Sequence, residues 1–157
     1  FIGLNYYFRF RAKKGLVPMS FISPYLTFDM LRPFDEDRPE GIYTALMDVH
    51  RRYGKPIYVT ETGTTHDDPR RGAGWTVRTL AETRRAIQDG ADVRGYFAWS
   101  LMDNYEWNHG MKMRFGLYAV DPVTKDRTIR EAGRVYGQMA KARDVPAALE
   151  QQYAPAP

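Results

Sequence analysis

Three runs of mostly apolar residues alternate along the chain with longer stretches in which apolar residues recur every three or four positions. Because the runs are nearly continuous in apolar residues, they predict strands buried on both faces, as in a parallel sheet. These strands are expected at residues 1–8, 57–60 and 93–100. The periodic stretches predict helices at residues 39–53, 75–88 and 130–143.

The segments between these elements show little periodicity. An extended hairpin is expected around 114–121, a long loop over 9–37 and a polar turn over 61–74. The loop contains several aromatic residues, which favour an ordered conformation. The end of the chain, residues 146–157, is rich in Ala, Gln and Pro and predicts a flexible tail.

The order of the predicted elements is strand, helix, strand, helix, strand, extended segment and helix. Such alternation predicts an α/β fold with a parallel sheet. Three parallel strands need cover on both faces and partners at both edges, and only three helices are available. We therefore expect residues 1–145 to form an arc of a larger barrel. A chain that begins directly within a strand agrees with this expectation.

Composition and charge narrow the classes of function. The net charge of +4 comes from scattered basic residues, which disfavours nucleic-acid binding. The chain has no cysteine and its three histidines are far apart, so no disulfide or metal site is expected, and no cofactor is implied. No apolar run reaches the roughly 20 residues that cross a bilayer, and no signal peptide is visible. We expect a cytoplasmic protein without membrane contact.

The run from Gly95 to Trp107 is the most informative segment. It begins as an aromatic strand and continues into two acids, an amide and two tryptophans. Aromatic faces stack against the C–H face of a sugar, while carboxylates and amides bind its hydroxyl groups. Because pockets concentrate polar groups among aromatic ones, the run predicts carbohydrate binding. The alternative is a core strand whose aromatic residues only pack.

Each predicted strand ends on polar or aromatic groups. Asn5 and Tyr7 end the first strand, Glu61 the second and Trp99 the third. In an eight-stranded α/β barrel the carboxyl ends of the strands form the active site, so these side chains are expected to face one pocket. Glu61 is a competent nucleophile toward the anomeric carbon of a sugar, and Tyr7 can orient it by a hydrogen bond. A salt-bridged, structural Glu61 is the alternative.

Other groups near these ends suit the recognition of hydroxyls. Glu106 can accept two hydrogen bonds, and the indole N–H of Trp107 can donate one. Trp99 offers a stacking face, and Asn5 can bridge a sugar hydroxyl. Taken singly, each of these residues could also serve packing alone.

Four motifs together resemble glycoside hydrolase family 1, the family of retaining β-glucosidases. They are Phe1–Tyr7, Pro56–Glu61, Gly95–Trp107 and Arg114–Leu117, in the family's order. The resemblance covers about residues 1 to 140 and implies a partial TIM (β/α)8 barrel holding strands six to eight with their helices. It departs at Thr62, where the family commonly has asparagine, while the following Gly63 still permits a sharp turn.

The resemblance also implies a role for each site residue. Glu61 is the catalytic nucleophile, and Tyr7 orients it. The implied substrate-binding residues are Asn5, Trp99, Glu106, Trp107 and Phe115. Trp99 forms the floor under the sugar ring, and Phe115 lies near the exocyclic group. Because a Glu106 carboxylate would repel a phosphate, an unphosphorylated sugar is implied.

The implied activity is hydrolysis of terminal β-D-glycosidic bonds with retention, on a small β-glucoside or a short oligosaccharide. A retaining hydrolase needs two carboxylates about 5–5.5 Å apart. The family's acid/base glutamate lies in a Thr-x-Asn-Glu-Pro motif that this sequence lacks. We therefore expect the C-terminal part of a barrel, inactive alone, whose partner is the missing N-terminal part. Two alternatives remain open: a non-catalytic sugar-binding or assembly fragment that needs a separate N-terminal chain, and a truncated relic without activity.

Overall fold

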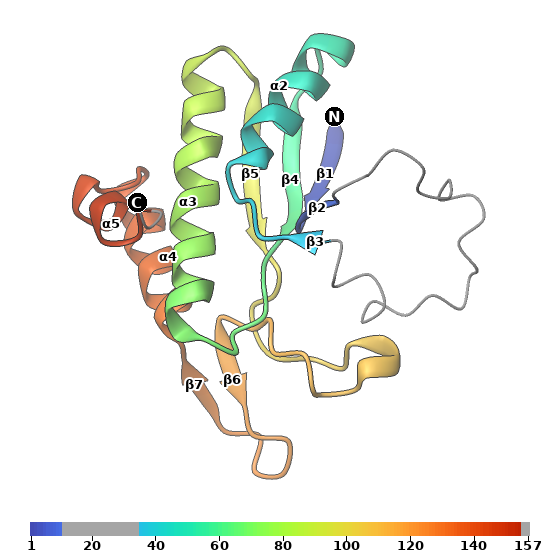
Figure 1. Cartoon of the computed structure of the whole chain (residues 1–157), viewed down its shortest axis with the longest axis vertical. Helices are drawn as coiled ribbons and strands as arrows, with labels where there is room; N and C mark the ends of the chain where they lie inside the picture. Colours follow the sequence, from blue (N-terminus) through green and yellow to red (C-terminus); the bar gives the residue numbers. More distant parts are fainter. Residues whose placement is uncertain (11–34, 155–157) are drawn as a thin grey trace.

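The computed structural model describes residues 1–10 and 35–154 (Figure 1). Most of the predicted loop over 9–37, including the aromatic residues expected to order it, lies outside these ranges. Where the described chain breaks off and resumes, two short strands, β2 (Arg9–Phe10) and β3 (Asp35–Glu36), pair in antiparallel fashion.

A three-stranded parallel sheet forms the centre of the structure, as the apolar runs predict. Its strands are β1 (Ile2–Tyr6), β4 (Ile57–Thr62) and β5 (Val93–Ala98), in the order β1-β4-β5. Both pairings are parallel, so the three carboxyl ends lie at the same edge of the sheet (Figure 1). Half-buried and exposed residues alternate along β1, and Phe97 of β5 is 57% exposed. The burial of both faces expected from the sequence is therefore absent within the described residues.

Helices cover one face of this sheet. The helix α2 (Gly41–Tyr53) places Ile42 and Leu46 in a fully buried cluster with Ile57 and Val59 of β4. These apolar residues lie on one side of the helix at the spacing that the sequence pattern predicted. The helix ends at Gly54, which adopts a left-handed conformation with φ of 55°.

The helix α3 (Pro69–Gln88) begins earlier than residue 75, where the sequence pattern placed its start. The Asp68 side chain caps it by accepting a hydrogen bond from the backbone N–H of Arg70. Pro69 occupies the first turn, where its missing N–H has no helical partner to lose. The polar turn predicted over 61–74 is therefore shorter than expected, because a helix-start signal lies within it and α3 begins at Pro69.

The chain continues beyond β5 with a hairpin and two helices. The predicted extended segment contains β6 (Tyr118–Val120), which pairs in antiparallel fashion with β7 (Arg127–Ile129). The helix α4 (Glu131–Ala142) matches its predicted position and packs beside α3. Between β5 and β6 the chain forms the 3-10 turn η3 (Trp107–His109).

The predicted flexible tail contains a packed helix instead. In α5 (Ala147–Gln152) and just beyond it, Leu149 and Tyr153 are only 8% and 6% exposed. Both belong to the apolar cluster that α3 and α4 share. Their spacing of four residues puts them on one side of a helical turn, a signal that the Ala-, Gln- and Pro-rich composition obscured. Across the described ranges, no helix is both long and apolar enough to cross a membrane.

Candidate active site

The strand ends bring three of the predicted site residues together. Asn5 of β1 lies opposite Glu61 of β4 in the register of the parallel pair. On the other side of β4, Thr62 lies opposite Ala98 of β5, so Trp99 follows directly at the same edge. Parallel pairing therefore places the three strand ends at one edge of the sheet, as the barrel hypothesis requires.

A short hydrogen bond joins Tyr7 to Glu61. The Tyr7 hydroxyl donates to Oε2 of Glu61 across 2.6 Å. Burial raises the pKa of Tyr7, and the hydrogen bond to Glu61 and the negative charges of Glu61 and Glu106 raise it further. Tyr7 therefore keeps its proton and remains a donor at any physiological pH, which fixes one carboxylate oxygen of Glu61 in place.

Glu106 is the second carboxylate of the site. Its Oε1 accepts a hydrogen bond from the indole Nε1 of Trp99 across 3.1 Å. Its negative charge also raises the pKa of Tyr7, by less than burial or Glu61 does. Trp99 thus has its ring oriented by Glu106, and the carboxylate retains acceptor capacity for further donors.

The remaining predicted residues take different positions. Asn5 is exposed and its Oδ1 accepts a hydrogen bond from the Thr60 hydroxyl at 2.7 Å. Phe115 is buried, and its ring lies edge-on to that of Tyr7 with 6.3 Å between centroids. Trp107 is 84% exposed, with a φ of 49°, and lies at the start of η3 rather than packed among the other groups.

The turn after Glu61 is tightly packed against the neighbouring strand end. A Cβ at Gly63 would overlap the carbonyl group of Trp99, so only glycine allows this approach. Thr62 is fully buried, and its hydroxyl accepts a hydrogen bond from the indole of Trp75. Thr62 therefore packs against α3.

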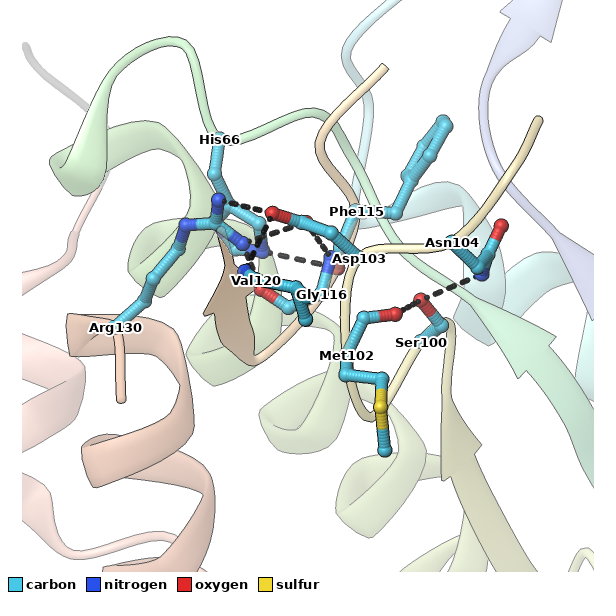
Figure 2. A network of polar contacts seen from close by, with 9 residues as sticks. All are labelled: His66, Ser100, Met102, Asp103, Asn104, Phe115, Gly116, Val120 and Arg130. Atoms are coloured by element: carbon cyan, nitrogen blue, oxygen red, sulfur yellow. Dashed lines mark hydrogen bonds and ion pairs between the residues drawn. The ribbon is translucent and has the colours of Figure 1, made fainter. Parts of the chain in front are cut away.

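A buried polar network beside the site was not predicted from the sequence (Figure 2). Asp103 and Arg130 form a bidentate ion pair with N–O distances of 2.8 and 2.7 Å. Burial alone would raise the pKa of Asp103, but hydrogen bonds from Arg130 and from backbone N–H groups outweigh it and hold that pKa below its usual range. An acid inside an aromatic run was a signal that Asp103 needs a partner, but the partner lies far along the chain.

His66 joins this network from the turn after β4. Its Nε2 lies 3.2 Å from the carbonyl oxygen of Phe115, and its backbone N–H donates to the carbonyl of Arg114. Burial lowers the pKa of His66, and the positive charge of Arg130 lowers it further. A neutral ring with the proton on Nε2 satisfies the Phe115 carbonyl.

The sequence predicts no metal-binding residue. In the part of the chain that the structure describes, no three His, Cys, Asp or Glu side chains gather in a way that could hold a metal ion.

Comparisons with known proteins place this arrangement in context. The family model of "Glycosyl hydrolase family 1" matches residues 29–145. A β-galactosidase of Sulfolobus acidocaldarius is 42% identical over 112 residues, which are 71% of this chain and 23% of that protein. β-Glucosidase A of Thermotoga maritima is 34% identical over 154 residues, covering 90% of this chain and 34% of that protein.

Solved structures agree with these sequence matches. A β-glycosidase from Pyrococcus horikoshii superposes with a TM-score of 0.82 at 37% identity, covering 99% of this chain and 37% of that one. The chain thus spans about a quarter of the length of the Sulfolobus protein and about a third of that of the Thermotoga protein.

Proposed function

Because this chain belongs to glycosyl hydrolase family 1, we propose that it carries the nucleophile of an enzyme that hydrolyses terminal β-glycosidic bonds with retention. β1, β4 and β5 then correspond to strands six, seven and eight of a (β/α)8 barrel. The observation that carries the proposal is the 2.6 Å hydrogen bond from Tyr7 to Glu61 at the carboxyl edge of parallel strands. This edge is where such barrels hold their catalytic groups.

The proposed reaction has two steps. The free carboxylate oxygen of Glu61 attacks the anomeric carbon, the bond to the leaving oxygen breaks, and a glycosyl ester forms. Water then attacks the same carbon and releases Glu61 as a carboxylate. Tyr7 stays protonated throughout and donates its hydrogen bond to the oxygen that does not attack.

A second carboxylate must protonate the leaving group and later activate the water. Glu106 is a poor candidate, because one of its oxygens is engaged by Trp99 and its position suits the binding of hydroxyls. We therefore assign the acid/base role to a residue outside these 157 residues, so that the chain alone is inactive and acts as part of a complete barrel.

The sugar is proposed to be unphosphorylated. Relatives of this chain include β-glucosidases, β-galactosidases and a 6-phospho-β-galactosidase of Staphylococcus epidermidis that is 35% identical over 121 residues. The carboxylate of Glu106 would repel a phosphate bound at the strand edge. Asn5, Trp99, Trp107 and Phe115 are proposed to contact the sugar with Glu106, on a β-glucoside or a short oligosaccharide.

The test uses the full-length protein that contains these residues. In hydrolysis of 4-nitrophenyl β-glucoside, Glu61→Gln should lower kcat by at least about a thousandfold, because the nucleophile is lost. Glu131→Gln is the matched control, since this half-exposed glutamate lies on α4 and should leave kcat unchanged.

Two outcomes would contradict the proposal. A Glu61→Gln rate within tenfold of wild type would remove the nucleophile role. Binding of glucosides by the full-length protein without any hydrolysis would instead favour the sugar-binding or assembly module.

A further inference from the structure

We propose that Arg130 is a positioning residue for this site. Through Asp103 and Gly116 it holds Phe115 against Tyr7, and so sets the hydrogen bond from Tyr7 to Glu61. The inference rests on the proposed role of Glu61 as nucleophile. Arg130 itself lies between β7 and α4, at the N-cap of α4, and acts only through the residues between it and Glu61.

The first link is the ion pair. Arg130 and Asp103 bury their side chains to 16% and 6% exposure, and two parallel N–H···O contacts fix their relative orientation. A bidentate pair of this kind is demanding in geometry, because each nitrogen must meet its own oxygen at the same time. A buried ion pair is weak evidence for stability by itself, whereas its geometry directly restrains the groups that it contacts.

The second link is Gly116, which the pair holds from both sides. Its N–H donates to Oδ1 of Asp103 at 3.0 Å, and its carbonyl accepts from Arg130 at 2.6 Å (Figure 2). A Cβ at this position would overlap the backbone of Asp103 and Met102. The ion pair therefore restrains the backbone at Gly116 on both sides.

The third link runs from Gly116 to Phe115. The carbonyl of Phe115 accepts a hydrogen bond from the Ser100 N–H and faces Nε2 of His66. Because this carbonyl and the Gly116 N–H belong to one peptide unit, these contacts and the one to Asp103 together orient that unit and the Phe115 side chain that faces Tyr7. The two rings meet at an interplanar angle of 78°, the edge-to-face arrangement that aromatic pairs favour.

The last link is Tyr7 itself. Its ring is confined by Phe115, and its hydroxyl reaches Glu61 at 2.6 Å. Hydrogen bonds weaken steeply with distance and angle, so a small shift of the ring removes the contact. If Arg130 no longer holds Gly116, Phe115 moves, Tyr7 loses its support, and the Glu61 carboxylate loses its orientation.

A double-mutant cycle in the full-length protein tests this chain of contacts. With 4-nitrophenyl β-glucoside, Arg130→Met should lower kcat about 10- to 100-fold, as expected for misplacement of a reacting group. KM should rise by a smaller factor, because Phe115 is also proposed to contact the sugar. Arg130→Lys keeps the positive charge but cannot form the two parallel contacts to Asp103, so its kcat should lie between those of the wild type and Arg130→Met. In a Tyr7→Phe background the hydroxyl is already absent, so Arg130→Met should change kcat by less than about twofold.

Arg134→Met provides the matched control. This arginine lies one turn along α4, half-exposed, with a 3.6 Å contact to Glu131, and its loss should leave kcat unchanged. Each variant must also melt above the assay temperature. If Arg130→Met does not, the cycle is completed with Arg130→Lys.

An equal fall in kcat in both backgrounds would show that Arg130 only supports the fold and would overturn the inference. So would a crystal structure of the Arg130 variant in which the Tyr7–Glu61 contact stays at 2.6 Å. The two proposals fail separately: a fully active Glu61→Gln protein refutes the nucleophile, whereas the Tyr7–Glu61 distance in the variant crystal still decides the positioning role.

Discussion

Replacing Tyr7 by phenylalanine removes one hydroxyl and leaves the ring in place against Phe115. The change therefore isolates the hydrogen bond to Glu61 from the packing of the ring. No new cavity larger than one oxygen atom is created in the half-buried position. We expect a variant that folds as the wild type does and reacts more slowly.

The size of the effect follows from the contact that is lost. A hydrogen bond to a charged group contributes about 1.5–3 kcal/mol. Since each 1.36 kcal/mol changes a rate tenfold, the loss of this one predicts a fall in kcat of about 10- to 150-fold. The effect should be much smaller than that of Glu61→Gln, because the attacking carboxylate is still present.

The assay is steady-state hydrolysis of 4-nitrophenyl β-glucoside by the full-length protein and the variant, from about pH 5 to 9. Because burial and the neighbouring Glu61 raise the pKa of Tyr7, its hydroxyl stays protonated over this range, and the wild-type to variant ratio attributable to it should stay constant. A kcat within twofold of wild type would refute the orienting role. A ratio that collapses toward alkaline pH would show that Tyr7 titrates and that its surroundings do not hold its proton.

Two further predictions concern the fold. The pKa of Asp103 is held low in the folded state despite burial, so its stabilising effect is present above the usual aspartate pKa of about 3.9 and is lost as the pH falls through the lower folded value. In urea unfolding between about pH 7 and 3, Asp103→Asn should therefore lose less stability than the wild type. Equal losses would contradict this role of Asp103. Leu149→Ala should lower the free energy of unfolding by about 2–3 kcal/mol, because the side chain is buried in the cluster shared with α3 and α4. The exposed Gln151→Ala should leave it almost unchanged. An unchanged melting temperature for Leu149→Ala would instead support the flexible tail expected from the sequence.

Much of the fold was readable from local pattern. Continuous apolar runs predicted the parallel strands, and the 3.6-residue period predicted α2 and α4, because burial of one side of an element is written into its own residues. The apolar run before Glu61 predicted that this residue lies at the carboxyl end of a strand, and the structure places it there in β4. The start of α3 was missed although Asp68 and Pro69 signal it, because the periodic signal only begins later.

Only the tertiary structure decided which distant groups meet. Asp103 could have paired with any of the chain's 23 basic residues, and the fold selects Arg130 by bringing the start of α4 beside the segment after β5. The packing of Phe115 against Tyr7 depends in the same way on contacts between segments far apart in sequence. The sequence determined which side chains must be buried, while the choice among partners depends on three-dimensional proximity, which no local period encodes.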